Sequence, residues 1–570
     1  MRYLALACDY DGTLARHGTV DEPTVEALER ARSSGRKLIL VSGRLLDDLM
    51  QVFPRLDLFD RVVAENGALL YHPEKREERV LAERPPEKFA EELSRRGVGP
   101  LGIGRVIIGT WHPHENAVLE AIRDLGLELQ VTFNKGAVMI LPSGINKATG
   151  LSAALGELGL SPHNVAAVGD AENDHALLTL CECAVAVANA LPALKESADW
   201  VTERDHGAGV RQLIESLIET DLGWLEERLA RHDIPLGIGA DGSEFKIRPY
   251  GESVLLAGSS QGGKTTLATG LIERLLERRY QVCVLDPEGD YSELEQAIVL
   301  GDGNKPPTAT EVTEVLAKPE ASLAVNLLGI GVEHRPDFFA QLFPRLQELR
   351  VRRGRPHWIV LDETHHLLPA NWEAARLALP QAGSGFLMIT VKPEHVAREA
   401  LALASTVIAI GESPEQTIRV FCETIGEPPP RLDPIKLEKG DALVWSRRTK
   451  RGPIWIRSHP PSGVRKRHHR KYAQGELSPE LSFYFRGPDN RLNLRAQNLR
   501  IFLQLADGVD DETWLHHLRQ REYSRWFRQV IKDDHLADEA ARVEEKPGLS
   551  AGESRQQIRL MIEKRYTREV

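Results

Sequence analysis

Four short groups of polar residues in the first 175 positions have the types and the order that phosphoryl transfer requires. They are Asp9-Tyr10-Asp11-Gly12-Thr13, Ser42-Gly43-Arg44, Asn146-Lys147 and Gly169-Asp170-Ala171-Glu172-Asn173-Asp174. A carboxylate nucleophile splits ester hydrolysis into two displacements, a second acid carries a proton, and a hydroxyl and a lysine hold phosphoryl oxygens. Further carboxylates supply the oxygen ligands that Mg²⁺ prefers. Together these residues predict a metal-assisted phosphoryl-transfer site.

Parallel strands are the elements that would position these groups. Apolar runs at residues 3–8, 37–41 and 165–168 end directly before three of the four groups, and Lys147 opens a helix-like stretch. The carboxyl ends of parallel strands face the ligand crevice of an open α/β sheet. Gly12 permits a tight turn around a phosphate. We therefore expect the four groups at one edge of an α/β sheet.

A second chemistry begins after an apolar run at residues 253–257. The next eight residues fit the pattern G-x-x-x-x-G-K-[ST], and residues 266–278 have helical spacing. These eight residues are Gly258, Ser259, Ser260, Gln261, Gly262, Gly263, Lys264 and Thr265. In such a loop, backbone N–H groups surround the β-phosphate, the lysine reaches the β- and γ-phosphates, and the Thr265 hydroxyl binds Mg²⁺. The motif predicts ATP binding.

An acidic pair further along the chain indicates that the bound nucleotide is hydrolysed. The apolar run at residues 358–361 ends in Asp362 and Glu363. Asp362 would orient the magnesium shell, and Glu363 would polarise the attacking water. This pair favours an ATP-hydrolysing class of protein over a small-molecule kinase.

The four motifs in the first 219 residues resemble those of the haloacid dehalogenase (HAD) superfamily. The stretches 185–190 and 198–202 are similar to its subclass IIB phosphatases, which act on sugar phosphates and similar metabolites. The resemblance implies Asp9 as the nucleophile that forms an aspartyl phosphate, Asp11 as the general acid/base, and Ser42 and Lys147 as phosphoryl holders. It places Mg²⁺ on Asp9, Asp11 and Asp170, with Asn173 or Asp174 as a further ligand.

The same resemblance implies a Rossmann-like core, residues 1–67 and 144–219, with an α+β cap inserted at residues 68–143. A compact cap is compatible with a small phosphorylated metabolite as substrate. Four cap residues have two interpretations each, as specificity contacts or as ordinary surface and core positions. They are Arg105, Trp111, His112 and His114.

The run from Val282 to Tyr291 resembles the second-strand motif of HerA and FtsK-like ATPases, and the similarity covers residues 235–470. It implies a RecA-like P-loop α/β domain and a homo-oligomer, with a hexameric ring as one form. The chain departs from the family at Thr390-Val391-Lys392, where a Ser/Thr-Gln pair is usual. No arginine finger is assigned, because several arginines are candidates: Arg350, Arg352, Arg353, Arg355 and Arg398.

Length and spacing predict an α/β protein of several domains, because 570 residues exceed what one core of about 150 residues accommodates. A helical linker is expected at residues 220–234 and a small, mostly helical domain at residues 471–570. The end of the chain from Val543 is either a loose tail or an oligomerisation helix.

Composition limits the remaining function classes. Five cysteines in 570 residues make no disulfide framework, and no apolar stretch reaches the roughly 18 residues of a membrane span. We expect a cytoplasmic protein with no membrane contact. The formal charge of −11 gives no overall attraction to nucleic acid.

One local exception to this acidic net charge is the basic stretch between Ser446 and Lys471, which is either a nucleic-acid contact or a charged linker.

The leading interpretation is a phosphatase for a small metabolite fused to an ATPase. The alternative is a nucleic-acid motor whose phosphatase removes phosphates from nucleic-acid ends.

Overall fold

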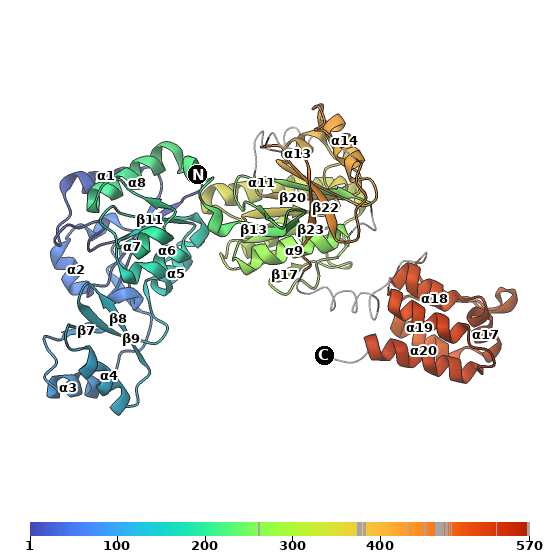
Figure 1. Cartoon of the computed structure of the whole chain (residues 1–570), viewed down its shortest axis with the longest axis horizontal. Helices are drawn as coiled ribbons and strands as arrows, with labels where there is room; N and C mark the ends of the chain where they lie inside the picture. The colour runs from blue at the N-terminus through green and yellow to red at the C-terminus, as the bar shows by residue number, and fades with distance from the viewer. Residues whose placement is uncertain are drawn as a thin grey trace. The chain divides into compact units, whose positions relative to one another are not determined.

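The computed structural model describes residues 1–259, 263–372, 379, 384–432, 434–449, 452–461, 472, 477, 479, 481–531 and 533–566. The chain forms two compact units, Met1–His459 and Pro460–Val570 (Figure 1). The sequence predicts this boundary at residue 470. Within its described residues the first unit contains two large sheets and one small sheet.

The first large sheet has eight strands in the order β12-β11-β10-β1-β2-β3-β4-β5 among the described residues. Its strands are β1 (Ala5–Asp9), β2 (Lys37–Val41), β3 (Arg61–Ala64), β4 (Leu69–His72), β5 (Glu77–Val80), β10 (Val165–Gly169), β11 (Cys183–Ala186) and β12 (Trp200–Val201). The six strands from β12 to β3 are parallel, whereas β4 and β5 are antiparallel additions. The carboxyl ends of β1, β2 and β10 therefore share one edge.

Helices cover both faces of this sheet (Figure 1). They are α1 (Glu22–Ser33), α2 (Leu46–Val52), α5 (Lys147–Leu158), α6 (His175–Leu180), α7 (Pro192–Ser197) and α8 (His206–Thr220). α1 packs on α8, and α5 packs on α6 and on β3. The central strands β1 and β10 are wholly buried because both faces are covered, which explains their continuous apolar runs. This arrangement confirms the Rossmann-like α/β fold predicted for the N-terminal part.

A smaller layer is inserted between β5 and α5. It consists of α3 (Glu87–Arg95), α4 (Glu115–Asp124) and an antiparallel sheet in the order β6-β7-β9-β8. Those strands are β6 (Gly102–Ile103), β7 (Ile108–Trp111), β8 (Leu129–Asn134) and β9 (Ala137–Pro142). The sequence predicts a cap that begins at residue 68. In the structure β4 and β5 instead extend the core sheet, because Leu69 and Leu70 are buried in the core beside β3.

The second large sheet has eleven strands within the described residues, in the order β14-β13-β23-β22-β21-β15-β20-β19-β16-β18-β17. They are β13 (Ile234–Gly239), β14 (Glu244–Ile247), β15 (Val254–Gly258), β16 (Val282–Asp286), β17 (Ala297–Leu300), β18 (Ser322–Asn326), β19 (Trp358–Leu361), β20 (Phe386–Thr390), β21 (Thr406–Ile410), β22 (Asp441–Ser446) and β23 (Ile454–Ser458). The strands from β21 to β17 are parallel, and the remaining four form an antiparallel extension. The sheet is therefore mixed.

Alternate residues of β15 pack against different helices. Val254 and Leu256 contact the core beneath α9 (Lys264–Glu277), whereas Leu255 and Ala257 face the opposite core. That opposite face is covered by α10 (Ala309–Leu316), α11 (Arg335–Arg353), α13 (Arg398–Ala402) and α14 (Pro414–Ile425). Helices on both faces of a mostly parallel sheet make this a second α/β layer structure.

The second unit is small and mostly helical. Its elements are β24 (Phe483–Phe485), β25 (Leu494–Ala496), α16 (Leu499–Gly508), α17 (Asp511–Arg519), α18 (Glu522–Trp526), α19 (Asp534–Glu544) and α20 (Ala551–Tyr566). Ile558 and Ile562 of α20 are buried in the core of this unit, and Trp514 donates a hydrogen bond to Ser554 at 3.0 Å. Residues 551–566 are therefore an integral helix and not a loose tail.

The described residues contain no helix that is both long and apolar enough to cross a bilayer.

We expect Gly67→Ala to destabilise the first unit through one backbone contact. Gly67 has φ +104°, and a Cβ there would lie 1.9 Å from the carbonyl oxygen of Asn146, which caps α5. Gly35→Ala is the control, since Gly35 has φ +89° but open space around it. Urea unfolding should show a loss about 1–3 kcal/mol larger for Gly67→Ala. Equal losses would contradict the steric explanation.

Candidate active sites

A buried lysine holds two carboxylates at the edge of the first sheet. Asp9 is the last residue of β1, and Lys147 is the first residue of α5. The Lys147 ammonium donates to Asp9 Oδ1 and to Asp174 Oδ1, both at 2.6 Å. All three side chains are almost completely buried. A lysine is rarely this buried unless it is paired, so its position depends on both acids.

Burial and charge shift the pKa values of this triad. Burial, reinforced by the charge of Asp174, raises the pKa of Asp9, although Lys147 opposes that shift. Burial would lower the pKa of Lys147, but the charges of Asp174 and Asp9 outweigh it and raise that pKa. These shifts favour the charged form of Lys147 and the protonated form of Asp9, so positive charge beyond that of Lys147 would favour the Asp9 carboxylate.

Asp170 brings a fourth charged group to the same edge. It follows β10, is buried, and accepts hydrogen bonds from the Thr13 hydroxyl at 3.1 Å and from the Lys135 ammonium at 2.6 Å. Lys135 also donates to the main-chain oxygen of Asp11 at 3.3 Å. Because Lys135 lies between β8 and β9, it carries a cap side chain to the ends of the core strands.

The two candidate ligands at positions 173 and 174 occupy different environments. Asp174 Oδ2 accepts the backbone N–H groups of Asp170 and Ala171, each at 3.0 Å, so both its oxygens have partners. Asn173 donates from Nδ2 to Asn66 at 3.0 Å, while its buried Oδ1 has no hydrogen-bond partner in the described structure. Asn173 therefore keeps a free buried oxygen.

This oxygen-rich set fits a magnesium ion. Oxygens of Asp9, Asp170 and Asp174 lie within 4.8 Å of one another, and the unpartnered Asn173 Oδ1 adds a neutral donor. Carboxylate and amide oxygens are the donors that Mg²⁺ prefers. The residues that would hold it are Asp9, Asp170 and Asp174, whose oxygens cluster, with Asn173 Oδ1 as a further donor.

The structure places Asp11 and Ser42 beside the triad but outside its hydrogen bonds. Asp11 forms a bidentate ion pair with Arg44, at 2.6 and 2.8 Å, so Arg44 holds its carboxylate. Ser42 follows β2, is buried, and its hydroxyl accepts the Arg44 N–H at 3.2 Å. The predicted metal set therefore gathers without the Asp11 side chain.

Sequence reasoning missed three residues that shape the site: Glu65, Asn66 and Lys135. The buried Glu65 carboxylate accepts the backbone N–H groups of Arg105, Val106 and Ile107 at 2.8 to 3.0 Å and so ties the cap to the core. The string Glu65-Asn66-Gly67 after an apolar strand was the available signal, since Asn-Gly marks a turn. The sequence offered no comparable signal for Lys135.

The sequence left open whether four cap residues are specificity contacts or ordinary surface and core positions, and the structure gives contacts for three of them. Arg105 pairs with Asp47 and Glu78, which joins the cap to the core surface. His112 bonds Glu115 at 3.1 Å, His114 bonds the Gly99 carbonyl at 3.0 Å, and Trp111 is exposed. These contacts favour the interpretation as surface and packing residues.

A second group of polar residues lies at the carboxyl edge of the second sheet. Gly258 ends β15 and Lys264 begins α9, where the buried Lys264 ammonium donates to the Gly258 carbonyl at 3.0 Å. Ser259, Gly263 and Thr265 flank it, and Thr265 is exposed. Three further residues of this motif lie outside the described residues, namely Ser260, Gln261 and Gly262.

Acidic residues face Lys264 from neighbouring strands. Asp362 and Glu363 follow β19, and Asp286 ends β16. Burial, followed by the charge of Asp286, raises the pKa of Asp362 well above its usual value, and burial raises that of Glu363. Burial lowers the pKa of Lys264, although the charges of Glu363 and Asp362 oppose that shift. The edge thus combines one cation with several desolvated acids.

Four of the five arginines considered as an arginine finger bind backbone carbonyls instead. Arg350 donates to Pro356, His357 and Gly385, and Arg355 donates to Gly159, Leu316 and Ala317. Arg353 donates to Leu158 and Arg398 to Ile425, while Arg352 is exposed and pairs with Glu348. Residues 450, 451 and 462–471 of the predicted basic stretch lie outside the described residues, and they include seven of its ten lysines and arginines.

Comparison with known proteins finds similarity in the N-terminal part. A family model described as "haloacid dehalogenase-like hydrolase" matches residues 6–95 and 105–214. The phosphoglycolate phosphatase of Methanothermobacter thermautotrophicus is 31% identical over 230 residues, which cover 39% of this chain and 99% of that protein. Phosphoglycolate phosphatase 2 of Saccharolobus solfataricus is 30% identical over 225 residues, covering 39% of this chain and 94% of that protein.

Solved structures match over the same share of the chain. A haloacid dehalogenase-like hydrolase from Bacteroides thetaiotaomicron has 20% sequence identity and a TM-score of 0.34, and the match covers 38% of this chain and 99% of that one. A subclass IIB sugar phosphatase has 19% identity and a TM-score of 0.32, covering 37% and 98%.

Lys147→Met should destabilise the protein and make its stability depend on magnesium. Removing one partner from a buried ion pair costs about 3–5 kcal/mol, because the remaining charges lose their compensation. We expect thermal unfolding with and without Mg²⁺ to show a larger stabilisation by Mg²⁺ in Lys147→Met than in the wild type. Lys88→Met, an exposed lysine on α3, is the control. Equal Mg²⁺ effects in all three proteins would contradict the compensating role of Lys147.

Proposed function

The N-terminal part of this chain belongs to the haloacid dehalogenase-like hydrolases, and we propose that it hydrolyses the phosphate ester of a small phosphorylated metabolite of the phosphoglycolate type. The observation that carries the proposal is the triad of Asp9, Lys147 and Asp174 beside Asp170. Relatives named as phosphoglycolate phosphatases, similar over nearly their whole length, support the substrate class.

Each residue of the site has a chemical role in this proposal. The Asp9 carboxylate attacks phosphorus and forms an aspartyl phosphate, which water then hydrolyses. Lys147 and Ser42 hold the phosphoryl oxygens, and Asp11 donates a proton to the leaving-group oxygen. Bound Mg²⁺ supplies positive charge that offsets the repulsion between Asp9 and the anionic substrate.

Lys135 supports a substrate that carries a second negative group. It comes from the cap, is about half exposed, and its ammonium already lies on Asp170 and on the Asp11 main chain. A short substrate held by its phosphate at Asp9 therefore extends toward a cation. A carboxylate two atoms from the phosphate ester oxygen, as in phosphoglycolate, suits that position.

Phosphate release with Mg²⁺ should be fastest for a small metabolite. The panel comprises phosphoglycolate, sugar phosphates, nucleotides and 3′-phosphorylated DNA, each measured with wild type and Asp9→Asn. We expect turnover of the metabolite to fall by ~10³-fold or more in Asp9→Asn, because the nucleophile is lost. Turnover of only the phosphorylated DNA would overturn the proposal and favour the nucleic-acid motor.

The Lys135→Met variant separates the substrate class from the chemistry. At saturating Mg²⁺ it should raise KM for phosphoglycolate by about 10- to 100-fold, the value of a lost hydrogen bond to a charged group. KM for ethyl phosphate, which lacks the carboxylate, should rise much less, only as far as the Lys135–Asp170 pair supports the magnesium ligand. Lys88→Met should behave as the wild type. The same rise in KM for both substrates would contradict the carboxylate contact.

We further propose that the second sheet binds and hydrolyses ATP, with Mg²⁺, in a homo-oligomer. The proposal is supported by Lys264 at the start of α9, facing Asp362 and Glu363. A hollow of about 500 Å³ is lined by Ser259, by polar residues that include Lys392 and Gln416, and by apolar residues that include Val391 and Ile410. Its position next to the lysine suits the sugar and base of a nucleotide.

Lys264→Ala should weaken ATP binding at least tenfold, or about 1.4 kcal/mol, by calorimetric titration. Lys318→Ala is the control, because Lys318 is exposed and distant in sequence from the motif. Glu363→Gln should bind ATP as the wild type does yet release phosphate from it more slowly, since Glu363 would polarise the water. Unchanged binding in Lys264→Ala would contradict the ATP site.

A further inference from the structure

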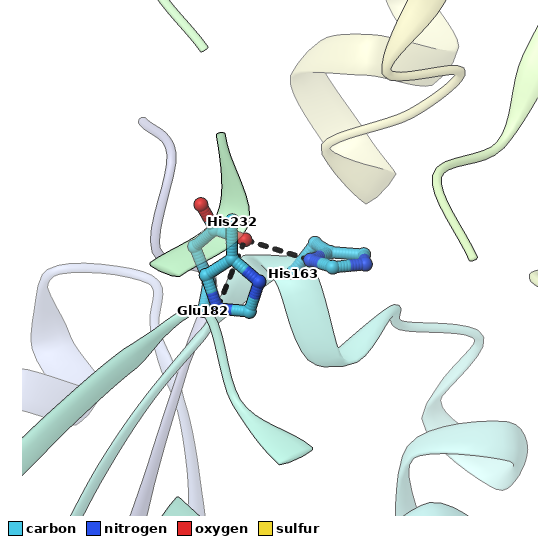
Figure 2. Close-up of side chains that lie close together, drawn as sticks. All are labelled: His163, Glu182 and His232. Carbon is cyan, nitrogen blue, oxygen red and sulfur yellow. Dashed lines mark hydrogen bonds and ion pairs between the residues drawn. The ribbon is translucent and has the colours of Figure 1, made fainter. Parts of the chain in front are cut away.

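A cluster of two histidines and a glutamate lies where the two large sheets of the first unit meet. His163 belongs to the turn Pro162–Asn164 before β10, Glu182 lies directly before β11, and His232 ends the turn Ala230–His232 that leads into β13 (Figure 2). Glu182 and His163 are buried, and the His232 side chain is 13% exposed. The proposed phosphatase and ATP chemistry uses none of them.

The imidazole nitrogens of this cluster point at one carboxylate oxygen. His163 Nδ1 lies 2.7 Å and His232 Nε2 lies 4.0 Å from Glu182 Oε2 (Figure 2). His232 Nε2 is buried and has no hydrogen-bond partner among the described residues. An unpartnered imidazole nitrogen facing a carboxylate is a costly arrangement unless a cation lies between them.

The neighbouring contacts orient the ring nitrogens for a metal ion. His163 Nε2 donates to the Arg278 carbonyl oxygen at 2.7 Å, while Nδ1 lies 2.7 Å from Glu182 Oε2 and would exchange its own proton for the metal ion. A histidine that binds a metal usually donates its other N–H to such an acceptor. The Tyr280 hydroxyl donates to Glu182 Oε2 at 2.9 Å and Arg2 donates to Oε1 at 2.6 Å, which fixes the carboxylate.

A tetrahedral ion would require small shifts of these ligands. Two ligands at about 2.0 to 2.1 Å from such an ion lie roughly 3.3 Å apart, so from the observed separations of 2.7 and 4.0 Å His163 Nδ1 would move away from Glu182 Oε2 and His232 Nε2 would move toward it. The three ligand atoms all lie within 4.8 Å of one another. Two imidazoles and one carboxylate are a zinc-type donor set, unlike the all-oxygen set at Asp9 and Asp170.

We propose that His163, Glu182 and His232 bind a divalent transition-metal ion of the zinc class at the junction of the two sheets. The site is separate from the magnesium ligands at the edge of the first sheet. Its ligands come from the first sheet and from the segment that joins the sheets, and Arg278 and Tyr280 at the end of α9 support them. The ion would fasten the phosphatase part to the second sheet.

The test measures metal in the full chain, purified without a histidine tag and dialysed into buffer that contains Mg²⁺. We expect about one Zn²⁺ per chain by mass spectrometry, and visible d–d absorption when Co²⁺ replaces it. His232→Gln should lower Zn²⁺ affinity by at least about tenfold and remove the Co²⁺ bands. Because His232 has no hydrogen bond through Nε2, this variant keeps the buried contacts of His163 and Glu182.

Two further proteins make the outcome decisive. His334→Gln is the matched control, an exposed histidine 3.7 Å from Glu333, and it should bind Zn²⁺ as the wild type does. Asp9→Asn, which alters the magnesium site, should also keep its Zn²⁺ and its Co²⁺ bands. Added Zn²⁺ should raise the Tm of the wild type and of both these variants, but not of His232→Gln.

Phosphatase turnover of His232→Gln with Mg²⁺ should equal that of the wild type, so the metal site and the proposed phosphatase can fail independently. A wild-type chain that holds no Zn²⁺ and gives no Co²⁺ bands would overturn the site. Equal Zn²⁺ affinity in His232→Gln and the wild type would overturn it as well. In either case the cluster is an ion pair alone.

Discussion

Lys147 lies between Asp9 and Asp174, and the arrangement of the catalytic edge depends on this buried cation. Its two contacts at 2.6 Å join β1, the start of α5 and the loop after β10, three segments distant in the sequence. Asp174 in turn accepts the N–H groups of Asp170 and Ala171, so the same charge network shapes the loop that carries Asp170. Each acid is buried here only because a cation accompanies it.

The residues of this edge could be predicted from the sequence where a local pattern of apolar and polar residues marks them. Asp9, Ser42 and Asp170 directly follow apolar runs, and the carboxyl ends of parallel strands meet, so the sequence alone suggested their proximity. The Rossmann-like fold of this part is confirmed for the same reason. In the second sheet, the runs before Gly258 and Asp362 likewise became the strands β15 and β19.

Contacts made across the fold were beyond that reasoning. Lys135 reaches Asp170 only because the segment between β8 and β9 of the cap carries it to the core. The half-buried Asp11 and Arg44 side chains pair across 33 positions of the chain, and no local sequence pattern marks such a pair. The strands β4 and β5 joined the core since antiparallel pairing with β3 buries Leu69 and Leu70. The helix Ala551–Tyr566 has sparse apolar residues, yet Ala551, Ile558 and Ile562 are buried in the core of the second unit.

The junction between the two large sheets is built from polar groups that each need a partner on the other side. The Arg355 guanidinium donates to the Gly159 carbonyl at 2.7 Å, and the Tyr280 hydroxyl donates to Glu182 at 2.9 Å. A chain cut between the sheets would expose these groups to solvent without the hydrogen-bond partners that the other sheet provides. The phosphatase part is thus not an interchangeable module, and a recombination that supplied a different second domain would have to bring matching donors with it.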